Sequence, residues 1–168
     1  ERLSNQFPVF VVDHFSKLYG LRNLVDQNCW DMLYNLHALR KHYLEVEIFA
    51  RFVEEYYSDK DLLFYLYARN VVQKELRINF KQRWSELGRG KERMPPALPV
   101  SHREASRISK LIFGPDAKEL SRALMQLFDD HCIGERGSTR GGGDTRRLDV
   151  MQYLHLALVQ YREAKGPD

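Results

Sequence analysis

The stretch that decides the fold is residues 22–57, RNLVDQNCWDMLYNLHALRKHYLEVEIFARFVEEYY. Its apolar residues recur every three or four positions in two runs, which is the spacing of a buried stripe along an α-helix. We expect the buried positions to be Cys29, Trp30, Leu33 and Leu36 in the first run, and Val46, Phe49, Phe52, Val53 and Tyr56 in the second. The polar segment RKHY separates the runs. The stretch therefore predicts two amphipathic helices joined by a loop.

A further helix is expected on each side of this pair. Upstream, Pro8 can begin a short helix and Gly20 can end it. Its expected apolar face is Val9, Val12, Phe15 and Leu18. Downstream, residues 60–78 open with LLFYLYA, which is apolar on every side and would suit a buried strand or a buried helix. The length of the segment favours a central buried helix, with a core of Leu63, Leu66, Tyr67 and Val71.

The C-terminal half is expected to contain three more helices. Ser101 and Glu104 match the S-x-x-E capping box at the start of a helix that runs to Phe113. Two others are predicted over 117–131 and 149–164 from their apolar spacing. With about seven helices and no alternation of strands with helices, the sequence predicts an all-α fold class.

Glycine and proline interrupt the chain between residues 80 and 100. These residues are Gly88, Gly90, Pro95, Pro96 and Pro99. They end regular structure, and a loop of this length is unusual inside a compact domain. Two arrangements therefore fit: a single helical domain over 1–168, or two small lobes, 1–79 and 101–168, joined by a loop over 80–100.

The composition is that of a folded chain. Of its 168 residues, 43% are hydrophobic, which is enough to fill a core. No run approaches the roughly 18 apolar residues of a membrane span, and the first residues lack the layout of a signal peptide. Two cysteines, Cys29 and Cys132, suggest reduced thiols rather than a disulfide framework. We therefore expect a cytoplasmic protein without a transmembrane segment.

The loop inside residues 22–57 has an apolar register typical of calcium-binding helix-loop-helix motifs. An EF-hand loop of twelve residues supplies oxygen ligands from positions 1, 3, 5, 7, 9 and 12. With Leu44 at the eighth position, the loop covers residues 37–48, between Leu36 and Phe49. Positions 1, 3, 5 and 12 are occupied by His37, Leu39, Lys41 and Ile48. The stretch resembles a degenerate EF-hand that keeps the apolar register and has lost its calcium ligands.

A looser resemblance to EF-hands covers the C-terminal helices. Asp129 falls at the first loop position, Leu148 at the eighth and Gln152 at the twelfth, with about a dozen residues inserted relative to the family's spacing. The template can also be laid over residues 80–104, using Val100. A generic helical bundle with short loops would give similar spacing. The sequence leaves both interpretations open.

The short motifs that mark common enzyme and metal sites are missing from the sequence. It contains no HExxH, no CxxC, no P-loop, no Rossmann fingerprint and no GxSxG elbow. His37, His42 and Glu45 share the loop at 37–48, and a solvated loop accounts for them better than a soft metal site. We therefore expect no enzyme activity, no catalytic residue, no metal site and no cofactor.

The resemblance to calmodulin-like domains implies a protein partner, an amphipathic helix or peptide held in an apolar groove, here without calcium. It also implies a cytoskeletal, ciliary or motor-associated setting. Aromatic and arginine side chains are common at the centres of interfaces. The candidate partner-binding residues are Phe64, Tyr67, Lys81, Arg83 and Trp84. The sequence leaves the oligomeric state open.

A second hypothesis uses the two segments where basic residues concentrate. Residues 77–93 and 136–147 can bind anionic partners such as RNA, acidic tails or phosphoinositides. The net charge of the whole chain is only +3. Nucleic acid is therefore not expected to be the main partner.

Overall fold

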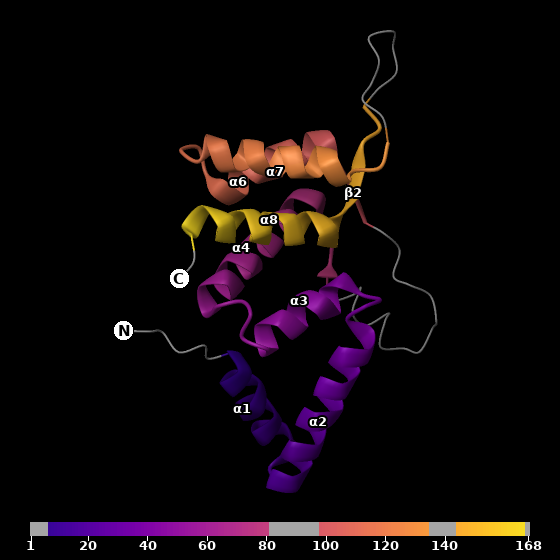
Figure 1. The fold of residues 1–168 in the computed structure, drawn as a ribbon, viewed down its shortest axis with the longest axis vertical. Coiled ribbons are helices and arrows are strands. Elements are labelled where there is room, and N and C mark those ends of the chain that lie inside the picture. The colour runs from indigo at the N-terminus through magenta and orange to yellow at the C-terminus, as the bar shows by residue number, and fades with distance from the viewer. Residues whose placement is uncertain (1–6, 81–97, 135–143, 167–168) are drawn as a thin grey trace. The chain divides into compact units, whose positions relative to one another are not determined.

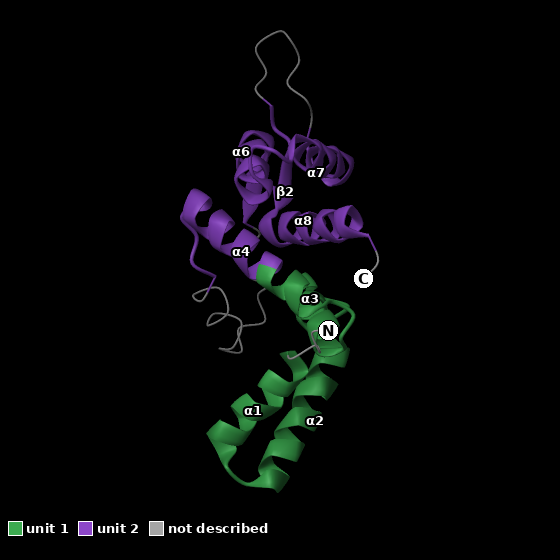
Figure 2. Ribbon diagram, turned by 90° about the vertical axis from the view of Figure 1, so that its left-hand side faces the viewer, with its two compact units in different colours: residues 1–63 green, residues 64–168 purple. Residues whose placement is uncertain are grey.

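The computed structural model describes residues 7–80, 98–134 and 144–166 (Figure 1). The chain divides into two compact units, 1–63 and 64–168, and the division falls inside helix α4 (Asp59–Leu76) (Figure 2). The described residues form seven helices and one two-stranded sheet. The helical class is confirmed, and the small sheet is an element that the sequence did not predict. The lobe boundary at 80–100 stays a prediction, since most of that segment lies outside the described residues.

Unit 1 contains α1 (Phe7–Tyr19), α2 (Arg22–Leu39) and α3 (Leu44–Val53). α1 and α2 form a hairpin through Gly20, whose φ of 71° is a backbone conformation that glycine adopts at little cost. The ring of Phe7 meets the rings of Phe49 and Phe52 edge-on, with centroids 5.6 and 6.0 Å apart. These contacts anchor the start of α1 to α3.

The hairpin buries a different face from the predicted one. The buried and half-buried positions of α2 are 25, 28, 29, 32 and 36, so Trp30 and Leu33 are exposed while Cys29 and Leu36 are half-buried. On α1, Val11 is buried, and the predicted Val9, Val12 and Leu18 are exposed. Both helices carry apolar residues over a wider arc than one neighbouring helix covers. Helical spacing alone therefore could not identify the buried side.

The predicted loop at 37–48 is a short turn. α2 continues to Leu39 and α3 begins at Leu44, so residues 40–43 alone join them. Leu44 occupies the first turn of a helix and not a strand. A strand at Leu44 would have no partner for its backbone hydrogen bonds, because the described part of unit 1 contains no strand.

α4 begins at a reciprocal cap formed by Ser58 and Asp61. The Ser58 hydroxyl accepts a hydrogen bond from the Asp61 amide at 3.3 Å, and the Asp61 carboxylate accepts one from the Ser58 amide at 2.9 Å. The predicted core of α4 is wrong. Ala68 and Val72 are buried, Val71 is half-buried, and the exposed residues are Leu63, Leu66 and Tyr67. A segment that is apolar on every side gives no periodic signal for the buried face.

The described part of unit 2 contains residues 64–76 of α4 and three further helices, with one strand before α6 and another before α8. The elements are β1 (Pro99–Ser101), α6 (His102–Phe113), α7 (Lys118–His131), β2 (Arg147–Asp149) and α8 (Val150–Lys165). β1 and β2 are antiparallel, and Val100 lies opposite Leu148 at the centre of the pair. The capping box of Ser101 and Glu104 is confirmed.

The core of unit 2 lies between α8 and the α6–α7 pair. Its fully buried side chains include Ile108, Leu124, Phe128, Tyr153, Leu154 and Leu158. The Tyr153 hydroxyl donates to the carbonyl of Ala105 at 3.0 Å, and burial raises the pKa of this phenol. Within the described residues, no helix is long and apolar enough to cross a membrane.

Candidate partner-binding surfaces and loop centres

The structure places two of the predicted partner-binding residues on α4. Phe64 stacks on Tyr161 of α8, with ring centroids 3.9 Å apart, and on Phe113 of α6 at 5.8 Å. The Tyr67 hydroxyl donates to the Leu111 carbonyl at 3.1 Å, and half of this side chain is exposed. Phe64 therefore holds α4 on its neighbours, and Tyr67 is the more accessible of the two. The other predicted residues, Lys81, Arg83 and Trp84, lie outside the described residues.

The α1–α2 hairpin exposes many apolar side chains. On α2 they include Trp30 and Tyr34, which are 74% and 76% exposed, and Leu33 between them. Residues three and four apart share one side of a helix, so these three form a continuous surface, which we name the α2 face. On α1 the exposed apolar residues are Val9, Phe10, Val12 and Leu18. The sequence-based prediction assigned Trp30 to the core and did not identify this surface. The width of the apolar arc on α2 was the signal that could have indicated it.

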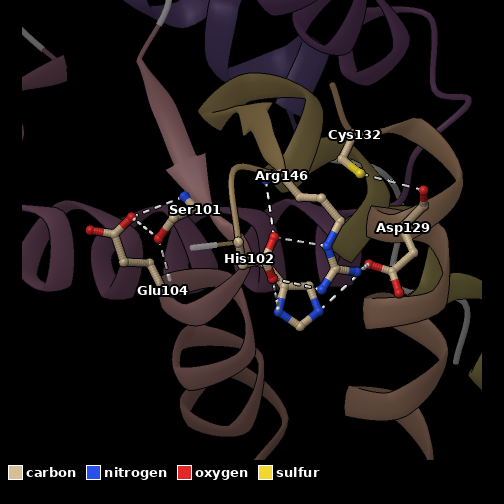
Figure 3. Close-up of polar contacts among 7 residues, drawn as sticks. Ser101, His102, Glu104, Asp129, Cys132 and Arg146 are labelled. Carbon is tan, nitrogen blue, oxygen red and sulfur yellow. Dashed lines mark hydrogen bonds and ion pairs between the residues drawn. The ribbon is translucent and has the colours of Figure 1, made fainter. Parts of the chain in front are cut away.

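A buried arginine pairs with carboxylates near the end of α7 and just before β2 (Figure 3). Arg146 is only 9% exposed, and its guanidinium donates two hydrogen bonds to the Asp144 carboxylate, at 3.0 Å from Nε and 2.7 Å from the terminal nitrogen. The other terminal nitrogen donates to Asp129, at the end of α7. Arg146 thus ties the end of α7 to the residues just before β2. We name Arg146, Asp129 and Asp144 the Arg146 centre.

His102, the first residue of α6, lies beside the Arg146 centre. Its Nε2 is 3.5 Å from Asp129 and its Nδ1 is 3.6 Å from Asp144. Its ring meets Phe128 edge-on at 5.7 Å. Hydrogen bonds from the Arg146 side chain and backbone lower the pKa of Asp144 to about 2. Both carboxylates of the centre therefore face the guanidinium of Arg146.

A second arginine spans the turn between α2 and α3. Arg40 Nε donates to Glu47 at 2.6 Å, and a terminal nitrogen of Arg40 donates to Glu54 at 2.5 Å. Arg51 donates to the other oxygen of Glu47 at 2.5 Å. The hydrogen bond from Arg40, followed by the one from Arg51, lowers the pKa of Glu47 to about 2. We name these residues the Arg40 network.

The basic segments predicted to bind anions are largely outside the described residues. This holds for residues 81–93 and 136–143. Among the described residues of these segments, Arg146 is buried and paired with Asp129 and Asp144. Its charge is therefore not available at the surface to bind an anion. In the parts of the chain that the structure describes, no three His, Cys, Asp or Glu side chains gather as a metal site. His37, His42 and Glu45 accordingly do not form such a group.

Comparison of the chain with protein-family models, with curated proteins and with solved structures finds no match.

Proposed function

We propose that this chain is a non-catalytic protein–protein interaction module that binds a partner helix or peptide independently of calcium. The exposed apolar surface of the α1–α2 hairpin carries the proposal. Large contiguous apolar surfaces are uncommon on free soluble proteins and mark interaction sites when they occur. Trp30 and Tyr34 are also the residue types that contribute most at interfaces, because their rings bury much area at little entropic cost.

The arrangement of unit 2 supports kinship with EF-hand domains. β1 precedes α6 and β2 precedes α8, and Val100 and Leu148, the residues on which the EF-hand template can be placed, lie opposite each other. Asp129, at the first position of the second loop, is bound by a guanidinium of the same chain. Calcium needs six to eight oxygen ligands. Asp129 and Asp144 are already bound by Arg146, so these two carboxylates are poorly placed to bind calcium, which favours a calcium-independent mode of binding.

The cellular setting is proposed from the same resemblance. Degenerate helical modules of this kind suit cytoskeletal, ciliary or motor-associated proteins in the cytoplasm, where a scaffold must bind its partner whatever the calcium level. Enzyme activity is not part of the proposal.

The test is to compare partner capture by the full chain and by a double variant, Trp30→Ala with Tyr34→Ala. Removing two aromatic contacts should reduce capture by at least about tenfold. Ile133→Ala is the matched control, since Ile133 is an 83% exposed apolar residue that belongs to unit 2 and not to the hairpin. Equal capture by the double variant and the control, with both variants folded by circular dichroism, would remove the α2 face from the proposed function.

A further inference from the structure

We propose that the groove between α6 and α7 binds an acidic, partly apolar peptide segment of the partner protein. This inference rests on the proposed function and names the chemistry of the partner. The groove has a volume of about 810 Å³, within the range of protein binding pockets, and both helices line it.

Small residues create the groove. Ser106, Ser109 and Ser121 line it where α6 and α7 face each other. Ser109 and Ser121 are buried, and the Ser121 hydroxyl donates to the Ser109 carbonyl at 3.2 Å. This hydrogen bond joins the two helices directly, and the short serine side chains leave the space above them open. Larger residues at these positions would fill the groove.

The rim of the groove is cationic. Lys110 contributes from α6, and Lys118 and Arg122, four residues apart on one side of α7, contribute from the opposite wall. Among the described residues, no carboxylate lines the groove and these three cations have no ion-pair partner. At the other end, His102 faces Asp129 and Asp144, whose charges Arg146 already offsets. The potential of the groove therefore favours negative charge near Lys118.

The shape and lining favour a peptide over a small anion. α6 has 12 residues, so the groove runs along a helix about 18 Å long. Leu111, Pro115 and Met125 place apolar surface next to the cations. A free phosphate would reach only the charged rim. A segment with acidic residues on one side and apolar residues on the other would satisfy both surfaces.

The experiment measures binding of a fluorescent peptide to the full chain by anisotropy. The probe is an amphipathic peptide of ~16 residues, about 24 Å as a helix, with glutamates on one face and leucines on the other. Lys118→Glu with Arg122→Glu should weaken binding by at least about tenfold, because two attractive contacts become repulsive. The same peptide with lysines in place of glutamates should not bind.

The matched control is Lys74→Glu with Arg103→Glu. It produces the same change in net charge at exposed positions of unit 2 that do not line the groove. We expect it to keep at least half of the binding. An equal loss in both double variants, or no loss in either, overturns the proposal. So does tighter binding of phosphatidylserine vesicles or of a single-stranded RNA through Lys118 and Arg122.

The outcome is separable from that of the proposed function. The proposed function is tested on Trp30 and Tyr34 in unit 1, and the groove is tested on Lys118 and Arg122 in unit 2. Loss of partner capture in the α2-face variant, with no peptide binding to the groove, keeps the interaction module and rejects the acidic segment.

Discussion

The turn between α2 and α3 and the loop between α7 and α8 both resemble the EF-hand loop template in sequence. Only the second of these connections contains a strand. Leu44 and Leu148 both occupy the eighth position of that template. Leu148 sits at the centre of β2, opposite Val100, whereas Leu44 begins α3. The difference teaches that an aliphatic residue in the right register forms a strand only where a second strand is available to pair with it.

The two connections also share a feature that the template does not contain. Each connection contains an arginine that bridges two carboxylates. Arg40 pairs with Glu47 and Glu54, and Arg146 pairs with Asp129 and Asp144. The Arg146 side chain is 10% exposed and that of Arg40 is 21% exposed. We therefore expect the Arg146 centre to contribute more to stability than the Arg40 network does.

The largest difference is expected between the two leucines. Leu148→Ala removes a buried side chain from the centre of the sheet and should lower the free energy of unfolding by about 3 kcal/mol. Leu44→Ala, at a half-buried helical position, should cost about 1 kcal/mol. Urea denaturation of both variants measures this. An equal loss in the free energy of unfolding for both variants would mean that strand pairing does not make Leu148 more important for stability than Leu44.

Replacing the arginines with methionine is expected to have the next largest effect. Arg146→Met leaves two neighbouring carboxylates without their shared cation, and should cost about 2 kcal/mol. Arg40→Met should cost about 1 kcal/mol, because its more exposed partners can return to water. Amide hydrogen exchange measures the stability of each unit separately. Exchange at the Ile133 and Arg147 amides should become faster in Arg146→Met and not in Arg40→Met. An equal or larger loss for Arg40→Met would reverse the proposed order.

The smallest predicted effect is on acid stability. The pKa of Glu47 in the folded protein, about 2, lies below its ordinary value of 4.5. Its contribution is therefore complete above pH 4.5 and is lost as the pH falls toward about 2. Wild type should lose up to about 1 kcal/mol more than Glu47→Gln between these limits. Acid titration of unfolding followed at α3 amides tests this, and parallel curves for the two proteins would contradict it.

Local sequence signals predicted the helices well and the surfaces poorly. The cap at Ser101 uses a neighbour three residues away, so the sequence alone was sufficient to find it. Trp30 and Leu63 were predicted to be buried and are exposed, because the apolar arc of a helix did not specify which side of it is covered. The Arg146 centre joins Asp129 to a residue 17 positions later. Such pairings depend on tertiary structure and leave no periodic pattern.

The most direct test of the account is calorimetry of the full chain with and without millimolar calcium. A ligand that binds only the folded state must raise the melting temperature by mass action. Because Arg146 already binds the carboxylates of Asp129 and Asp144, and Arg40 bridges Glu47 and Glu54 at the turn over 40–43, we predict an unchanged melting temperature and no heat of binding. A clear rise in the melting temperature with calcium, reversed by a chelator, would contradict the account.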